Sequence, residues 1–138
     1  LQQSSAASDV YKRQLLSIIK PENKINLLES NNKKCYFLKK VSHELKLKNT
    51  KIINKTIIKK NELGKFDIIT SRAFATIEKT INLTKTNTHE NTKYLLLKGK
   101  ASNIKKELKD IDKNMFRYEI INQDTTKERN IVLLCKDE

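Results

Sequence analysis

The sequence predicts an α/β fold in which a mainly parallel sheet ends in an antiparallel hairpin. Three observations lead to this prediction. Short apolar runs of strand length alternate with amphipathic helical segments, the connections are short, and the last two apolar runs are separated only by a polar segment. Parallel strands need helical crossovers, whereas consecutive strands can pair as a hairpin. A length of 138 residues suits a single domain with one core.

The first half of the chain contains four predicted elements. In order they are the end of a helix at 15–19, a strand at Ile25–Leu28, a helix from Asn31 to Leu47 and a strand at Lys51–Asn54. The first helix should stop at Lys20-Pro21, because proline disfavours helical geometry in the residue before it. The long helix is indicated by apolar residues at helical spacing, with lysines on the remaining turns.

The second half contains six predicted elements. They are a strand at Phe66–Thr70, a helix at 76–83, a strand at Tyr94–Leu97, a charged helix from Ser102 to Ile111, and strands at Phe116–Ile121 and Asn130–Cys135. The run at Phe66–Thr70 is almost continuously apolar, as expected for a strand buried on both faces of a parallel sheet. Ser102 is in position to cap its helix. The last two strands should form the hairpin at the sheet edge.

Composition narrows the classes of function. The net charge of +13 comes almost entirely from lysine and favours a polyanionic partner such as nucleic acid. An AT-biased genome would also produce a chain rich in Lys, Asn and Ile, so the charge supports this partner without proving it. No apolar run reaches the roughly eighteen residues of a membrane span, and we expect a soluble, cytoplasmic protein. Cys35 and Cys135 are expected to be buried thiols, and without a Cys/His cluster we expect no metal site.

The first fourteen residues differ in kind from the rest. Residues 1–14 are mostly small and polar, contain neither Ile nor Asn, and have no periodic apolar face. They resemble adapter-derived sequence that is translated at the ends of environmental assemblies. We therefore expect a non-native leader at 1–14, followed by the folded domain at 15–138.

The carboxyl ends of the predicted strands collect the candidate site residues at one rim of the sheet. Glu29 ends a strand and is followed at once by a helix, a position where an acid can bind both hydroxyls of a ribose. Taken alone, such an acid more often ends a strand at the surface beside the first turn of the helix, and Ser30 could serve simply as the N-cap. Ile57, Ser71-Arg72 and Lys98-Gly99 are expected on the same rim.

A series of motifs gives the sequence a resemblance to a known family. The motifs are Leu16-Ser17-Ile18-Ile19-Lys20-Pro21, Leu27-Leu28-Glu29-Ser30, Lys33-Lys34, Phe37-Leu38, His43-Glu44-Leu45-Lys46-Leu47, Phe66-Asp67, Ser71-Arg72-Ala73-Phe74-Ala75 and Leu97-Lys98-Gly99. In order and spacing they resemble the bacterial 16S ribosomal RNA guanine-N7 methyltransferases, also called glucose-inhibited division protein B or small-subunit ribosomal RNA methyltransferase G. The resemblance covers nearly everything from Leu15 onward, and the pentapeptide at Ser71 is its most discriminating part.

The resemblance implies a Rossmann-like fold that binds S-adenosylmethionine and methylates N7 of a guanine in 16S ribosomal RNA or in the small-subunit particle, as a monomer. Glu29 matches the acid that binds the ribose, with Ser30 beside it in the expected cofactor site. Ile57 and Ile58 match the pair beside the adenine, although the family usually has a carboxylate in place of Ile58. Arg72 matches the arginine at the mouth shared by cofactor and RNA. Guanine N7 already carries a lone pair, so no catalytic acid or base is expected.

One part of the family's pattern is not found in this sequence. Upstream of Leu15 the family has a helical region, then a strand and a glycine-rich loop that packs against the methionine end of the cofactor. The two glycines of this chain, Gly64 and Gly99, lie elsewhere. The resemblance therefore predicts the distal part of a methyltransferase that lacks the first strand and the glycine-rich loop and is inactive alone. That strand is expected between the strands at Ile25 and Phe66, whose edges would be left unpaired.

Basic residues near the rim are the expected RNA contacts. They are Lys33, Lys34, Arg72, Lys98 and Lys100. For each single lysine a solvated surface role is commoner than a phosphate contact. The alternative class is a non-enzymatic, basic RNA-binding α/β module. Such a module gives no reason for an acid at one strand end and an arginine at a neighbouring one, so the sequence favours the enzyme.

Overall fold

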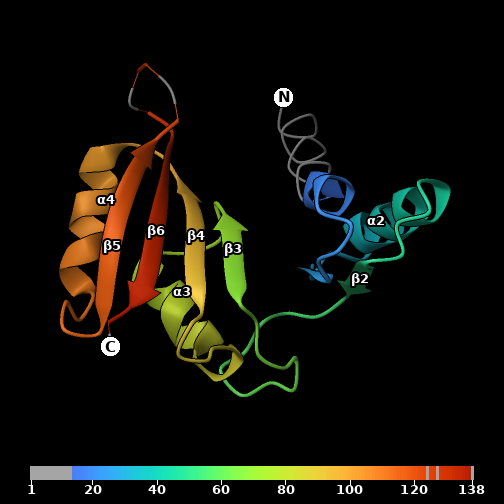
Figure 1. Ribbon diagram of the computed structural model, residues 1–138, viewed down its shortest axis with the longest axis horizontal. Helices are drawn as coiled ribbons and strands as arrows, with labels where there is room; N and C mark the ends of the chain where they lie inside the picture. The colour runs from blue at the N-terminus through green and yellow to red at the C-terminus, as the bar shows by residue number, and fades with distance from the viewer. Residues whose placement is uncertain (1–13, 124, 127, 138) are drawn as a thin grey trace. The chain divides into compact units, whose positions relative to one another are not determined.

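The computed structural model describes residues 14–123, 125–126 and 128–137. The chain divides into two compact units, which we call the N-terminal unit (Leu1–Ile57) and the C-terminal unit (Ile58–Glu138). Each unit has its own sheet (Figure 1). The expected single core is accordingly divided into two clusters of buried side chains. The expected leader lies outside the described residues except for Gln14.

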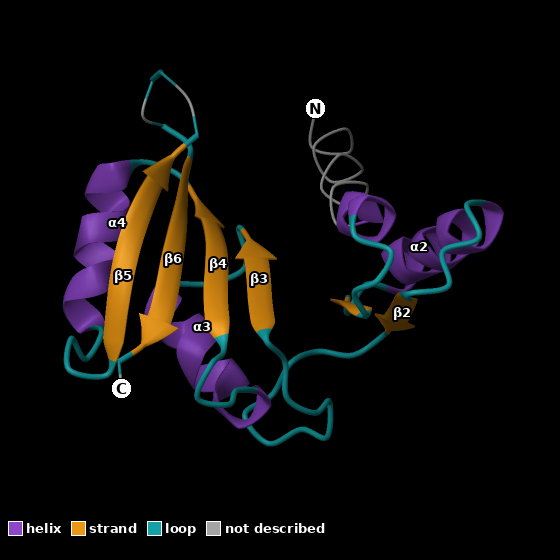
Figure 2. Cartoon of the chain, viewed as in Figure 1, coloured by secondary structure: helices purple, strands orange, loops and turns teal. Residues whose placement is uncertain are grey.

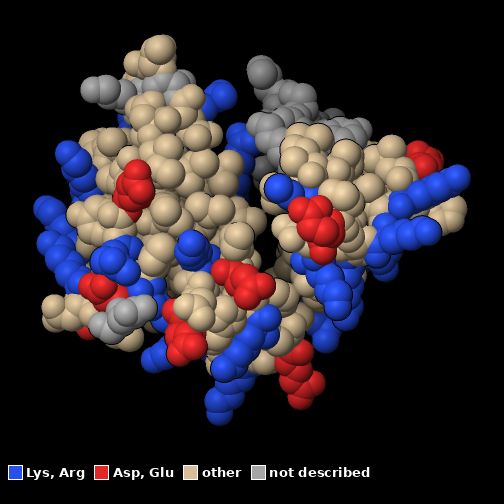
Figure 3. All heavy atoms as spheres, viewed as in Figure 1, with Lys and Arg blue, Asp and Glu red and all other residues tan. Residues whose placement is uncertain are grey.

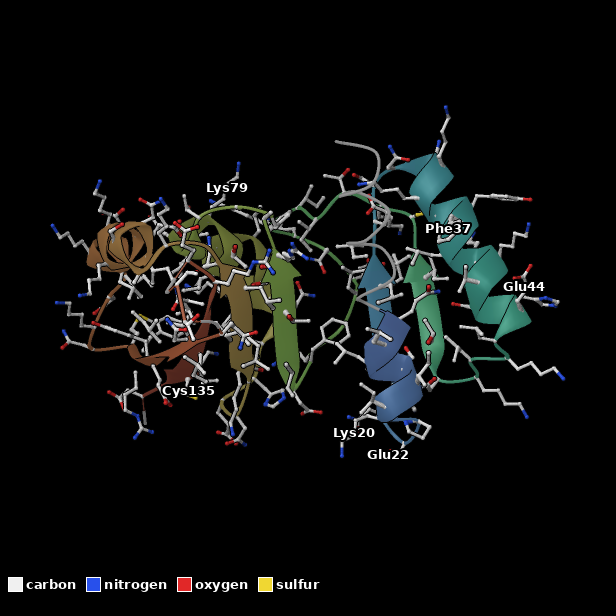
Figure 4. All side chains as sticks on the ribbon, turned by 90° about the horizontal axis from the view of Figure 1, so that it is seen from above. Lys20, Glu22, Phe37, Glu44, Lys79 and Cys135 are labelled. Carbon is white, nitrogen blue, oxygen red and sulfur yellow. The ribbon has the colours of Figure 1, made fainter. Side chains whose placement is uncertain are left out.

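The N-terminal unit contains one strand–helix–strand repeat. Strand β1 (Ile25–Leu28) leads through α2 (Asn32–Glu44) to β2 (Thr50–Ile53), and the two strands pair in parallel from one end to the other. Residues 14–19 are helical and stop before Lys20-Pro21, as predicted. The small core of this unit consists of Leu27 and Leu38, with Phe37 and two isoleucines packed around them. Figure 4 shows α2 lying along the two strands, with Phe37 and Glu44 labelled on it.

The end of α2 differs from the prediction. The helix was expected to continue to Leu47 but ends at Glu44. Lys46 adopts a left-handed conformation with φ of 52°, and the amides of Lys46 and Leu47 bond back to carbonyls of the last turn. This arrangement stops the helix by satisfying its free carbonyls. Leu45 is consequently exposed and does not continue the buried face of the helix.

The C-terminal unit contains the larger sheet. Its elements are β3 (Ile68–Arg72), α3 (Ile77–Thr84), β4 (Lys93–Lys98), α4 (Ala101–Glu107), β5 (Phe116–Asn122) and β6 (Asn130–Lys136), with short 3-10 turns at Lys85–Asn87 and Leu108–Asp110. The strand order is β3-β4-β6-β5. Strands β3 and β4 are parallel, whereas β6 runs antiparallel to both of its neighbours. The parallel pairing of β3 with β4 agrees with the predicted mainly parallel sheet, and the predicted C-terminal hairpin is confirmed.

Two predictions about the C-terminal unit were wrong. Strand β3 is not buried on both faces, since Ile68 is 54% exposed and β3 lies at the edge of the four-stranded sheet. The charged helix is not capped by Ser102. It begins one residue earlier at Ala101, because the amides of the first turn bond to the backbone carbonyl of Lys100, and no side chain caps it.

Both helices of the C-terminal unit cover the same face of its sheet (Figure 2). The buried cluster joins helix and strand residues: Ile77, Tyr94, Leu96, Ile104, Leu108, Phe116, Val132 and Leu134. Tyr94 and Phe116 meet edge to face with ring centroids 6.4 Å apart. The alternate residues of β4 and β6, such as Leu97 and Leu133, face the other way and are half-buried. Figure 3, drawn in the same view, shows the face of this sheet that the two helices leave uncovered. That face is mainly uncharged, and most lysines and arginines lie toward its edges.

Buried polar side chains fix the entry to β3. The amides of Asn61 and Asn87 bond to each other reciprocally at 2.7 and 2.9 Å, and Asn87 also donates to the carbonyl of Gly64 at 2.8 Å. Gly64 has a φ of 91°, a backbone conformation that a side chain would strain. The hydroxyl of Thr92 donates to the carbonyl of Phe66 at 2.7 Å. These contacts hold the polar loops that the sequence pattern left without a defined structure.

The two cysteines differ in burial. Cys35 is buried as predicted, whereas Cys135 is only partly buried, and neither forms a disulfide bond within the described residues. Within residues 14–123, 125–126 and 128–137, no group of three or more His, Cys, Asp or Glu side chains is placed to hold a metal ion. In the same part of the chain, no helix has the length and apolar character needed to cross a membrane.

We predict that Tyr94 makes the stability of the C-terminal unit fall at high pH. Burial raises the pKa of Tyr94 above its ordinary value of 10.0, and the hydrogen bond with Thr84 partly opposes this shift. The neutral phenol therefore contributes its full stability below pH 10, and this stability is lost as the pH rises through the folded-state pKa. Tyr94→Phe should cost about 1 kcal/mol near neutral pH and flatten the decline above pH 10. Urea unfolding measured from about pH 8 to about pH 11 tests this, with the exposed Tyr118→Phe as control. Identical pH profiles for the parent and Tyr94→Phe would contradict it.

Candidate functional site

Glu29 lies at the carboxyl end of the parallel pair in the N-terminal unit. Its amide donates to the carbonyl of Ile53 at 3.0 Å, and its carbonyl accepts from the thiol of Cys35 at 3.1 Å. Its carboxylate oxygen Oε1 accepts from the amide of Asn31 at 3.0 Å. The acid is therefore held on a fixed backbone between the end of β1 and the start of α2, where the sequence placed it.

The start of α2 differs from the sequence-based alternative in one respect. Asn31, not Ser30, is the N-cap, because its side chain accepts from the amide of Lys34 at 3.1 Å. Ser30 is exposed and lies one residue before the cap. Lys33 is exposed in the first turn of the helix and Lys34 is half-buried. Ser30 thus has no capping role and stands beside Glu29 at the surface.

Ile57 and Ile58 follow β2 in a segment without regular secondary structure. Ile57 is half-buried and Ile58 is exposed. They are the last residue of the N-terminal unit and the first residue of the C-terminal unit. The structure places both in the stretch of chain that joins the two units.

A second set of predicted residues meets at the carboxyl ends of β3 and β4. Arg72, the last residue of β3, pairs in register with Leu97, so Arg72 and Lys98 belong to neighbouring strand ends. Arg72 is exposed. The chain then turns sharply at Ala73, whose φ is 47°. Parallel pairing is what brings these two basic residues, 26 positions apart in the sequence, to one edge of the sheet.

Lys98 is held in a network that the sequence did not predict. Its ammonium donates to the carbonyl of Ala75 at 2.6 Å and to Glu107 Oε2 at 2.8 Å. The same carboxylate oxygen accepts from the amide of Ile77 at 2.9 Å. The side chains of Lys98 and Glu107 are 13% and 25% exposed, so water screens this ion pair only in part. Lys98 therefore ties the end of β4 to the loop before α3.

Lys100 and Glu107 show the limits of the charge pattern. Lys100 is exposed and forms a surface ion pair with Glu128 at 3.3 Å. Glu107 was missed by sequence analysis, because one acid among the lysines of a charged helix is indistinguishable from a solvated residue. Only its contact with Lys98 and with the start of α3 gives it a role. The structure therefore contains two local groups, one around Glu29 and one around Arg72 and Lys98.

Several solved structures with a similar fold are methyltransferases. An rRNA methylase from Streptococcus thermophilus matches with a TM-score of 0.61 and 10% identity, over 83% of this chain and 74% of that one. A ribosomal protein L11 methylase from Lactobacillus delbrueckii subsp. bulgaricus matches with a TM-score of 0.68 and 12% identity, over 91% of this chain and 66% of that one. At these identities the likeness concerns the fold, and it confirms the predicted Rossmann-like methyltransferase fold.

Sequence relatives identify the family. A protein from Brachyspira hyodysenteriae named ribosomal RNA small subunit methyltransferase G is 39% identical over 124 residues, which is 86% of this chain and 59% of that protein. A protein of the same name from Acinetobacter baumannii is 39% identical over 90 residues, or 62% of this chain and 42% of that protein. The chain thus spans about three-fifths or less of these relatives. The family model for rRNA small subunit methyltransferase G, GidB, matches residues 15–132, and the chain therefore belongs to the GidB family.

Proposed function

We propose that this chain belongs to an S-adenosylmethionine-dependent methyltransferase that modifies N7 of a guanine in 16S ribosomal RNA, free or in the small-subunit particle. We further propose that it acts in the cytoplasm as a monomer. The observation that carries the proposal is the position of Glu29 on a fixed backbone at the carboxyl end of β1, in a chain of the GidB family. The names of the relatives support the ribosomal RNA substrate.

In this proposal the end of β1 and the segment after β2 bind the nucleoside part of the cofactor. The Glu29 carboxylate accepts hydrogen bonds from the ribose hydroxyls, and its bond to the amide of Asn31 fixes its orientation. The exposed hydroxyl of Ser30 adds a polar group beside it. Ile57 and Ile58 supply apolar contact and backbone groups to the adenine.

The proposed reaction requires alignment of the methyl donor and the guanine more than it requires proton transfer. S-adenosylmethionine supplies an activated methyl group on its sulfonium. Guanine N7 carries a lone pair in its neutral form, so no proton would have to leave the guanine. The residues of this chain therefore bind and align the reactants, and none has to act as a general acid or base.

In the proposal the RNA is bound by cations that are exposed or, in the case of Lys34, half-buried. Arg72 and Lys100 stand near the ends of β3 and β4, and Lys33 and Lys34 stand in the first turn of α2. Each can contact phosphate, and the planar guanidinium of Arg72 can make two bonds at once. The ammonium of Lys98 is largely withdrawn from water by its bonds to Ala75 and Glu107. We assign it to holding the loop after Arg72. A purely RNA-binding module is disfavoured by the methyltransferase neighbours and relatives.

A chimeric protein tests the function. The segment that precedes the matched region in the Brachyspira hyodysenteriae relative should be joined to Leu15 in place of residues 1–14. We expect the chimera to transfer a labelled methyl group to 16S ribosomal RNA, and chemical cleavage at N7-methylguanine should locate it. The 138-residue chain alone should bind S-adenosylmethionine weakly and transfer nothing. A chimera that unfolds cooperatively but transfers no methyl group would refute the proposal.

Arg72→Ala in the chimera should cut turnover strongly while the unfolding transition stays in place.

Glu29→Gln tests the ribose contact in the same chimera. The amide still accepts from Asn31 but loses the charge that strengthens the bonds from the ribose, so the dissociation constant for S-adenosylmethionine should rise about tenfold. Calorimetric titration measures it. Glu22→Gln is the matched control, since this exposed acid lies away from Glu29 in the sequence and forms a long ion pair with Lys20 at 3.8 Å. Figure 4 labels Glu22 and Lys20. Equal effects of the two substitutions on the dissociation constant would show that Glu29 does not bind the cofactor.

Replacing Lys33 and Lys34 together by alanine tests the RNA surface on α2. Each phosphate contact that is lost should lower the slope of log affinity against log salt by about 0.7 for single-stranded RNA, hence by about 1.4 for the pair. Fluorescence anisotropy with labelled 16S RNA fragments at several salt concentrations gives this slope. The control replaces Lys39 and Lys40, two exposed lysines of the same helix, and removes the same charge. If both double variants lose the same slope, α2 contributes charge without a defined contact.

A further inference from the structure

The loop between β3 and α3 presents an aromatic side chain to solvent. Phe74 is 49% exposed, whereas the other three phenylalanines of the chain are buried or half-buried. Phe116, for example, packs against Tyr94 in the core. An exposed phenylalanine contributes little to folding, because its ring keeps much of its contact with water. Single exposed apolar residues are common, however, so exposure alone assigns no role to Phe74.

The backbone beside Phe74 is held in an unfavourable conformation. Ala73 has a φ of 47°, in the left-handed region that costs free energy for any residue other than glycine. Such strain persists only where the surroundings impose it, and it concentrates at functional sites. The strained residue lies between Arg72, fixed by its pairing with β4, and the exposed ring. Phe74 therefore directly follows the strained residue and is close in sequence to Arg72, the proposed RNA-binding arginine.

The far end of this loop is anchored as well. Lys98 donates to the carbonyl of Ala75 at 2.6 Å, and Glu107 joins Lys98 to the amide of Ile77, the first residue of α3. Thr76 caps the same helix by accepting from the amide of Lys79 at 3.3 Å. Residues 73–75 of the loop are thus fixed on both sides. A ring on a rigid loop loses little conformational freedom when a flat ligand binds to it.

We propose that Phe74 is a stacking platform for an unpaired base of the RNA, and that the Lys98–Glu107 pair positions the loop that presents it. Bases of single-stranded RNA stack on exposed aromatic rings, while a neighbouring arginine can bind the backbone phosphate. The proposal rests on the proposed function, since it takes RNA as the partner. The adenine of S-adenosylmethionine has the same flat chemistry, and the experiment must separate the two sources.

A tryptophan probe tests the proposal directly. The chain contains no tryptophan, so Phe74→Trp gives a single indole at the loop. Titration with a single-stranded RNA oligonucleotide should quench at least half of its emission, because a stacked base quenches indole fluorescence. Tyr118→Trp and Tyr36→Trp place the probe at exposed positions on β5 and α2 and should change little. A fully paired RNA duplex and S-adenosylmethionine, each titrated separately, should leave Phe74→Trp unquenched. Quenching by S-adenosylmethionine would assign the ring to the cofactor and overturn the proposal.

Affinity measurements with uncharged replacements give a second, independent test. Phe74→Ala should weaken binding of the single strand about tenfold, and Phe74→Tyr should retain most of the affinity. Neither should alter the salt dependence, because no charge changes. Lys98→Met in the Phe74→Trp background should reduce the quenching by releasing the loop, and Lys98→Arg should restore part of it. A Phe74→Ala variant that is folded by circular dichroism and binds RNA like the parent would also overturn the proposal.

The outcomes separate this proposal from the proposed function. If the chain binds the RNA with the expected salt dependence while the Phe74→Trp emission stays unchanged, the stacking platform is refuted and the proposed function stands. If anisotropy shows no binding of RNA by the parent chain, the RNA partner itself fails and the stacking platform fails with it. If Lys98→Met leaves the quenching intact, the positioning role of Lys98 is refuted.

Discussion

Parallel pairing of strands is the constraint on which both groups of candidate site residues depend. Two parallel strands cannot be joined by a tight turn, so the chain crosses over through a helix and the loops that leave the strands gather at one edge. The pairing of β1 with β2 puts Glu29 at such an edge, and the pairing of β3 with β4 puts Arg72 beside Lys98. The local sequence places each side chain at the end of its strand, but only the pairing of the strands brings these ends side by side.

Charge has two different uses in this chain. Most of the lysines are exposed, and together they give the net charge of +13 that suits a polyanionic partner. Lys98 is the contrast. Its ammonium is largely withdrawn from water, where pairing with Glu107 and with a backbone carbonyl offsets the loss of hydration. The same residue type therefore acts as a surface charge in one place and as an internal tie in another, depending on burial.

The proposed reaction is consistent with a site built from positioning groups. Guanine N7 is nucleophilic without losing a proton, so rate enhancement can come from alignment of the methyl donor and the base. Alignment requires rigid supports. The structure provides them as backbone and side-chain bonds around Glu29 and as the Lys98–Glu107 tie beside Arg72. The loop that Lys98 and Glu107 hold in place contains Ala73 in a left-handed backbone conformation and the exposed Phe74. Both features fit the same principle, because backbone strain persists where a side chain is presented to a ligand.

The sequence by itself determined the order and type of the elements, the mainly parallel character of the helix-connected strands, the hairpin and the strand-end positions of Glu29 and Arg72. These follow from apolar periodicity and from local signals such as Pro21, which act over a few residues. Tertiary structure decided what depends on distant partners: Lys98 as a tie to Glu107, the exposure of Ile68 at a sheet edge, and the division of the buried residues into two clusters. It also decided fine boundaries, such as the end of α2 at Glu44 and the start of α4 at Ala101. A local pattern cannot decide these points, because burial and ion pairing depend on residues that only the folded chain brings within contact distance.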